Sequence, residues 1–102
     1  MATTSKQMYN GAASTSSTTL YTAPSSAGAV AVVTNIIVAN TAGTSATYTL
    51  NLGGNAIATT VTVGAYDSAI IDLKQVLTAS QTITGLASAT TVNFFISGVE
   101  IV

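Results

Sequence analysis

The sequence contains no histidine, cysteine, arginine or tryptophan, and its single proline is Pro24. Histidine and cysteine are the usual ligands of transition metals in proteins, so no such metal centre is expected. The many serines lack the histidine that would activate one of them as a nucleophile. These absences predict a protein without a metal, a cofactor or a nucleophilic active site.

Charge is almost as scarce. Charged residues make up 5% of the 102 residues, whereas an ordinary globular protein has about 25%. The formal net charge is −1, and Lys6 and Lys74 are the only cations. Two lysines cannot form the basic surface that neutralises phosphate groups, so no nucleic-acid partner is expected.

The only carboxylates are Asp67, Asp72 and Glu100. Hydrolysis by paired carboxylates needs two such groups at one cleft, and a calcium loop needs several oxygen ligands close together. Asp72 and Lys74 are two residues apart on an expected strand and therefore share a face. We expect a weak surface ion pair there, within the chain or with a neighbouring subunit. The sequence thus predicts that the protein is not an enzyme.

Long apolar runs are absent too. The longest, residues 29–39, is interrupted by Thr34 and Asn35 and falls far short of the roughly 20 residues of a spanning helix. The N-terminal residues lack the apolar segment of a secretory signal. We therefore expect no membrane partner, and synthesis in the cytoplasm with any export by another route.

Hydrophobic residues make up 48% of the chain, and serine and threonine supply most of the rest. A chain of 102 residues is expected to form one domain with a modest core. A nearly neutral surface protects poorly against association. This composition favours an assembly protein, and the alternative is a monomer with a Ser/Thr-rich surface.

The most apolar stretch is residues 91–102, TVNFFISGVEIV, which holds both phenylalanines. We expect a long central strand there, bent at Gly98. Residues 45–52 and 57–63 alternate between apolar and polar side chains and are joined by a Gly-Gly-Asn turn, which predicts a hairpin. Inward positions of the second hairpin strand are expected at Ile57, Val61 and Val63, with Thr60 and Thr62 outward.

Further strands are expected at residues 18–22, 29–40 (bent at Thr34-Asn35), 68–73 and 81–86, with a helical turn or irregular corner at 74–80. About seven short strands at this spacing predict an all-β fold, a single antiparallel β-sandwich of jelly-roll or immunoglobulin-like (Ig-like) type, with a small barrel as the alternative. The predicted buried residues are Leu50, Leu52, Ile71, Phe94, Ile96 and Val99.

Residues 1–17 form a low-complexity segment whose only large apolar side chains are Met8 and Tyr9. So little apolar surface predicts a flexible N-terminal arm, with the sandwich domain spanning residues 18–102. The arm would become ordered on a partner. Lys6, Met8 and Tyr9 are its candidate contact residues, and a disordered tail is the alternative.

The remaining tyrosines differ in setting. Tyr21 and Tyr48 lie on expected strands and are predicted in the core or at a sheet edge. Tyr66 lies in an expected loop between Gly64 and Asp67. Tyr66 and Asp67 are therefore the candidate contact with a ligand or a second subunit.

Four segments together carry a resemblance to a known group: LYTAP at 20–24, VVTNIIVANT at 32–41, DSAIIDLKQVL at 67–77 and TVNFFISGVEI at 91–101. They resemble small virion structural proteins of tailed bacteriophages. The resemblance implies a β-sandwich on the virion exterior, a capsid cement (decoration) protein that binds the major capsid protein. It also implies a homo-oligomer, with a trimer favoured and a dimer open, and an extended terminal arm.

Two other functions stay open. One is a head or tail fibre module that binds a host receptor or glycan through Tyr66 and its loop. The other is a bacterial surface or pilus-like subunit, which the missing secretory signal disfavours.

Overall fold

A computed structural model describes residues 3–102 as an all-β chain of eight strands with no helix in that range. The strands are β1 (Thr3–Ala12), β2 (Thr18–Thr22), β3 (Val30–Asn40), β4 (Ala46–Leu52), β5 (Asn55–Val63), β6 (Ser68–Thr78), β7 (Thr82–Ala87) and β8 (Val92–Ile101).

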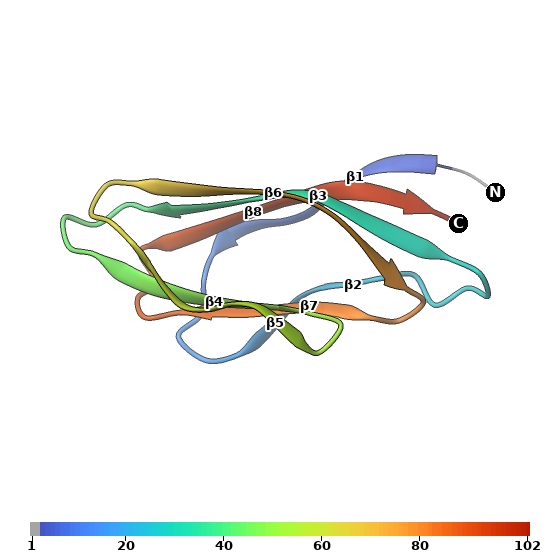
Figure 1. The fold of residues 1–102 in the computed structure, drawn as a ribbon, viewed down its shortest axis with the longest axis horizontal. Coiled ribbons are helices and arrows are strands. Elements are labelled where there is room, and N and C mark those ends of the chain that lie inside the picture. Colours follow the sequence, from blue (N-terminus) through green and yellow to red (C-terminus); the bar gives the residue numbers. More distant parts are fainter. Residues whose placement is uncertain (1–2) are drawn as a thin grey trace.

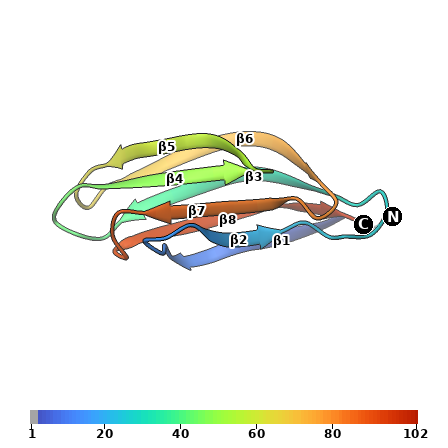
Figure 2. The same ribbon diagram turned by 90° about the horizontal axis from the view of Figure 1, so that it is seen from below.

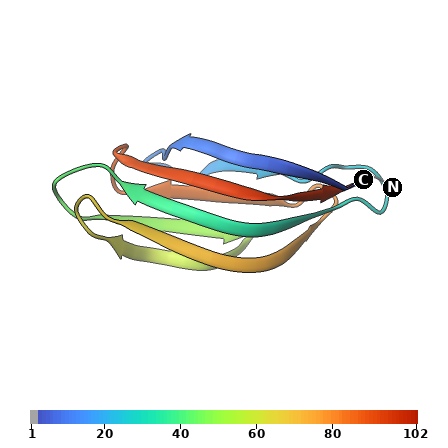
Figure 3. The same ribbon diagram turned by 90° about the horizontal axis from the view of Figure 1, so that it is seen from above.

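The strands form two four-stranded antiparallel sheets. We call the sheet with strand order β1-β8-β3-β6 sheet A, and the sheet with order β2-β7-β4-β5 sheet B. Figure 1 shows the two sheets as an upper and a lower layer of an elongated molecule that measures 45 × 21 × 18 Å. Figure 2 shows sheet B from its outer side, and Figure 3 shows sheet A from the opposite side.

The strands pair from the two ends of the chain inward: β1 with β8, β2 with β7, β3 with β6, and β4 with β5. Two further pairs, β3 with β8 and β4 with β7, complete the sheets. Among the eight strands of residues 3–102, the β4–β5 turn is the only connection that stays within one sheet. Each sheet is therefore built from distant segments, and neither can form alone from one stretch of chain.

The core lies between the sheets, where alternate side chains of the inner strands β3, β4, β7 and β8 meet. In β4 every second residue is buried, and β8 is buried at positions 92, 94, 96 and 98. Phe94 and Ile96 from sheet A and Leu50 and Ile83 from sheet B are fully buried. Phe94 also meets Tyr48 of sheet B edge to face, with ring centroids 6.5 Å apart, a favourable aromatic geometry.

Several sequence predictions are confirmed. The C-terminal stretch is strand β8, which lies between β1 and β3. The hairpin of β4 and β5 turns at Gly53 and Gly54, whose φ values are 58° and 86°, a conformation that glycine adopts without strain. The expected bend in β3 appears as a register shift between Val33 and Asn35.

The burial predicted for β5 is confirmed only in part, although Thr60 and Thr62 are exposed as predicted. Ile57 and Val61 are 42% and 39% exposed, and only Val63 is buried as expected. β5 is an edge strand of sheet B, and its register against β4 shifts around Thr60, which has a φ of 49°. An edge position leaves one flank of a strand without a neighbour, so an alternating pattern alone does not ensure burial.

Two predicted core residues are only partly buried. Leu50, Leu52, Phe94 and Ile96 are buried, whereas Ile71 and Val99 are half-buried. In β8 the buried positions continue from Ile96 to Gly98, so Val99 points to the outer face. Ile71 lies on β6, an edge strand of sheet A, where fewer neighbours cover it.

Residues 74–80 do not form a helical turn. Strand β6 continues to Thr78, and the chain turns at Ala79 and Ser80, where Ser80 has a φ of 65°. The Gln81 side chain stabilises this turn, since its Oε1 accepts a hydrogen bond from the Thr78 amide at 2.9 Å.

The expected flexible arm is also corrected over the part that is described. Residues 3–12 form β1, which pairs with β8 along its whole length, and Met8 is buried. Residues 3–12 have little apolar surface of their own. Their backbone pairing with β8 and the buried Met8 side chain nevertheless fix them to sheet A. Met1 and Ala2 lie outside the described residues.

Replacing Phe94 tests the assignment of the inner face. Phe94→Ala removes a fully buried ring and should lower the free energy of unfolding by about 3–5 kcal/mol. Phe95→Ala on the half-buried outer face is the matched control and should have less than half that effect. Chemical denaturation measures both, and equal losses would contradict the assignment.

Candidate functional site

No metal centre or membrane-spanning helix is found in residues 3–102. This range holds no group of three or more histidine, cysteine, aspartate or glutamate side chains that could bind a metal ion. Within the same range, no helix is long and apolar enough to cross a bilayer. The candidate sites are therefore surface features of the two sheets and their loops.

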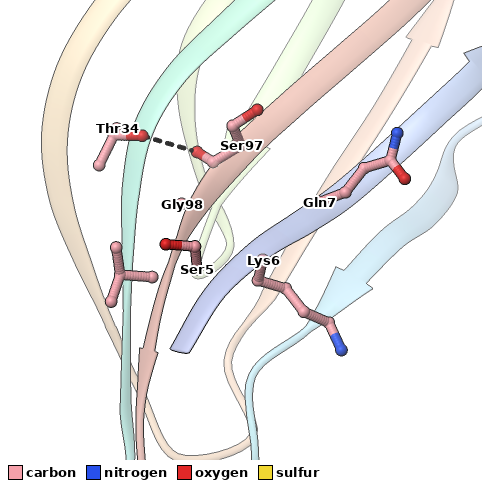
Figure 4. Close-up of a pocket in the computed structure, with 7 residues that line it drawn as sticks. Ser5, Lys6, Gln7, Thr34, Ser97 and Gly98 are labelled. Atoms are coloured by element: carbon pink, nitrogen blue, oxygen red, sulfur yellow. Dashed lines mark hydrogen bonds between the residues drawn. The ribbon is translucent and has the colours of Figure 1, made fainter. Parts of the chain in front are cut away.

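One such feature is a shallow hollow of about 500 Å³ on sheet A. It forms where the register of β1 against β8 shifts between Gln7 and Tyr9 and where β3 shifts between Val33 and Asn35. Figure 4 shows its polar rim, in which the Thr34 hydroxyl donates a 3.1 Å hydrogen bond to the Ser97 carbonyl. The hollow is lined by Ser5, Lys6, Gln7, Thr34, Ser97, Gly98 and Val99.

Gly98 allows this irregular region to close. A Cβ atom at position 98 would lie 2.2 Å from the Val32 carbonyl oxygen and 2.4 Å from the terminal carbon of Met8. Both distances are far below van der Waals contact. The buried Met8 side chain therefore occupies the space that a larger residue at position 98 would need.

Gly98→Ala should accordingly destabilise the protein, because the Val32 carbonyl is backbone and cannot move aside as a side chain could. We expect a loss of about 1–3 kcal/mol in the free energy of unfolding. Gly11→Ala is the matched control in the neighbouring strand, since a Cβ there has its nearest contact at 3.6 Å. A Gly98→Ala protein as stable as the control would contradict the close approach.

The structure separates the three residues that were expected to contact a partner together. Lys6 is exposed at the rim of the hollow and can meet a partner. Met8 is buried in the core and is not free to do so. Tyr9 is half-buried, and its hydroxyl donates a 2.8 Å hydrogen bond to the Ala12 carbonyl of its own strand.

Tyr66 and Asp67 lie together in the loop between β5 and β6. The Tyr66 side chain is 78% exposed, and its backbone has a φ of 53°. The Tyr66 amide donates a 3.0 Å hydrogen bond to the Ala42 carbonyl, which ties this loop to the β3–β4 loop. Asp67 accepts a 2.8 Å hydrogen bond from the Ser68 amide through Oδ1. The loop presents an exposed phenol on a fixed backbone.

Asn40, which the sequence did not single out, fixes these loops from beneath. It is 3% exposed, and its Nδ2 donates to the Thr44 carbonyl at 2.8 Å and to the Gly64 carbonyl at 3.2 Å. Its Oδ1 accepts from the Ala42 amide at 3.1 Å and the Thr91 hydroxyl at 3.4 Å. One buried amide thus links three loops at one end of the molecule. A single asparagine before a loop gives no signal of this role.

A second polar contact joins the two sheets. The Tyr21 hydroxyl of β2 donates a hydrogen bond to the Glu100 carboxylate of β8, although 79 residues separate them. The pKa of Tyr21 is raised from its ordinary value, first by burial, then by this hydrogen bond, and then by the negative charge of Glu100. Burial also raises the pKa of Tyr48.

These shifts predict a loss of stability in alkali. A tyrosine whose pKa is higher in the folded state keeps its proton above pH 10, where the unfolded chain loses it, so the free energy of unfolding falls as pH rises through that range. Tyr21→Phe should lose part of this pH dependence and keep the part due to Tyr48. Chemical denaturation at a series of pH values measures the free energy of unfolding. If this free energy fell equally steeply with pH in Tyr21→Phe and in the wild type, the Tyr21–Glu100 contact would be contradicted.

The largest apolar exposure lies along one side of the molecule, where β5 and β6 are the edges of their sheets. Figure 2 shows both strands along the same long side, opposite β1 and β2. We call this the β5–β6 side and define it by four exposed aliphatic residues: Ile57, Val61, Ile70 and Val76. A hollow of about 270 Å³, with Ile57 and Val76 among its lining residues, lies where the β4–β5 turn comes close to the end of β6.

Comparison with known proteins adds no relationship to these observations. No protein-family model matches the sequence, and no curated protein matches it.

Proposed function

We propose that the fold is a jelly roll. The pairs β1–β8, β2–β7, β3–β6 and β4–β5 are those of one long antiparallel ribbon whose tip is the β4–β5 turn and which is rolled into two sheets. Eight strands in two four-stranded sheets are the composition of a jelly roll. An Ig-like sandwich instead pairs consecutive strands such as the first and second, and β1 and β2 here lie in different sheets.

We further propose that the protein is a non-enzymatic structural component of a virion, a cement protein on the outside of a capsid. The observation that carries the proposal is the β5–β6 side, where Ile70 and Val76 are 67% and 57% exposed. Apolar side chains gathered along one side support binding to another protein. The resemblance of the four sequence segments to phage virion proteins supplies the class of partner, and jelly rolls occur in viral capsid domains.

In this proposal the partners are the major capsid protein and further copies of the chain. With five charged residues in the whole sequence, attachment depends on apolar contact and on backbone hydrogen bonds from sheet edges. The two edge strands of the β5–β6 side offer both. The trimer that the resemblance favours and the dimer are both compatible with attachment through this side.

The alternative function is a fibre or adhesin module that binds a host receptor or glycan. Tyr66 favours it, because a 78% exposed phenol on a loop fixed by hydrogen bonds is a suitable stacking surface for a sugar. Jelly rolls also occur in lectins. Asp67, next to it, would supply a hydrogen-bond acceptor.

Electron microscopy of particles labelled with an antibody to the protein distinguishes the two functions. A cement protein should label the shell at many positions, and a fibre module should label one vertex or the tail. The double variant Ile57→Thr/Val61→Thr, which removes apolar surface from β5 without shortening it, should bind purified shells about tenfold more weakly.

Val102→Thr is the control for that variant, since Val102 is 47% exposed but lies at the end of the chain and outside the β5–β6 side. It should bind as wild type does. Label confined to a vertex, together with loss of binding to host cells in Tyr66→Ala, would replace the cement proposal by the fibre module.

A further inference from the structure

Strand β6 is an edge strand that presents an unusual row of side chains. Ile70, Asp72, Lys74 and Val76 are all exposed, at alternate positions of the strand. Of the neighbouring positions, Ala69, Ile71 and Leu73 are half-buried and Leu77 is buried, whereas Gln75 is exposed as well. The four exposed residues therefore share the outer face of sheet A at its open edge.

The order of these four residues is symmetric about Leu73. Each side of Leu73 has first a charged residue and then a branched aliphatic one: Asp72 and Ile70 toward the N-terminus, Lys74 and Val76 toward the C-terminus. The two charges have opposite signs, and the two aliphatic residues are similar in size. A second copy of this row, placed beside the first in the antiparallel direction, would therefore set each charge opposite its counterion and each aliphatic residue opposite another.

We propose that β6 pairs with β6 of a second copy of the chain, antiparallel and centred on Leu73, so that sheet A continues across a two-fold axis. In this register Asp72 faces Lys74 of the second copy, and Lys74 faces its Asp72. Ile70 faces Val76 of the second copy in the same way. Two ion pairs and two aliphatic pairs form at once, and no like charges meet.

Cross-strand pairs of opposite charge and of branched residues stabilise antiparallel sheets. Residues directly opposite each other have Cα atoms about 4.5–5.5 Å apart, so each pair would be in contact. Backbone groups at an open sheet edge supply hydrogen bonds to an added strand. The proposed contact therefore combines backbone pairing with side-chain specificity.

Charges on an edge strand commonly prevent such pairing, because like charges are brought together. On β6 positions 72 and 74 carry opposite charges, so in the centred register the charges attract each other and favour pairing. No other register brings Asp72 opposite Lys74. A shift by two residues would place Asp72 opposite Asp72 or Lys74 opposite Lys74. The same charges that permit the centred register thus disfavour the neighbouring ones.

The other sheet edges do not offer this pattern. β1 has Lys6 without a carboxylate, and β2 is only five residues long. β5 has no charged residue, and its ladder is interrupted at Thr60. β6 also has an irregularity, since Leu73 and Lys74 have no one-to-one partner on β3, but the exposed row continues through that point.

This inference does not depend on a virion role. A strand that pairs about its own middle closes with two copies, so it specifies a dimer where the phage resemblance favours a trimer. β5 and its apolar residues remain available for another partner.

Charge exchange tests the proposed pairs. Sedimentation equilibrium of the full chain should show a dimer. Lys74→Asp would place like charges opposite each other at both pairs and should weaken the dimer on the order of tenfold. The double variant Asp72→Lys/Lys74→Asp restores opposite charges and should recover most of that loss. Asn10→Asp, which adds a charge at an exposed position of β1 on the opposite edge of sheet A, should leave the dimer unchanged.

Cysteine cross-linking tests the register, and the chain has no native cysteine to interfere. Ile70→Cys and Val76→Cys are single changes at exposed positions. When the two variants are mixed and oxidised, a disulfide-linked heterodimer should form, because residues 70 and 76 face each other at a distance suited to a disulfide. Each variant alone should form little, since residue 70 does not face residue 70.

A wild-type chain that sediments as a monomer would overturn the inference. A dimer whose affinity is unchanged by Lys74→Asp, or equal cross-linking in the separate and mixed cysteine variants, would also overturn it, because another surface would then form the contact. None of these results would depend on where the protein binds in a particle, so they are distinct from a failure of the cement proposal.

Discussion

Apolar contact between the inner faces of the two sheets is the interaction on which the structure depends. Large side chains such as Phe94 and Leu50 fill most of this layer, and small residues such as Ala31, Ala46 and Ala87 are buried among them. Truncating a large side chain leaves a cavity, because the neighbouring alanines have no volume with which to fill it.

One polar contact lies at each end of this apolar layer. Asn40 links the β3–β4, β5–β6 and β7–β8 loops at one end, and Tyr21 meets Glu100 near the chain terminus at the other. A buried amide with all its hydrogen bonds satisfied fixes geometry at little energetic cost. The loop that carries Tyr66 and the region where β8 ends are thus positioned without a network of charges.

The sequence was most informative where the signal is local. Alternation and the Gly53-Gly54 turn predicted the β4–β5 hairpin, and the apolar content of residues 91–102 predicted the central strand. It failed where the outcome depends on a distant neighbour: β1 is a strand because β8 lies beside it, and Ile57 is exposed because β5 has no neighbour on one side. The Asn40 and Tyr21 contacts arise from strands far apart in the chain, which no local pattern indicates.

Hydrogen exchange at low and high protein concentration addresses the role of the β5–β6 side directly. Amides of β8 and β3, which have neighbours on both flanks, should exchange slowly at every concentration. If β6 is the side on which copies meet, amides within residues 68–78 should gain protection as concentration rises, while those of β1 at the opposite edge of sheet A stay constant. Protection gained in β1, or in no edge strand, would contradict that role.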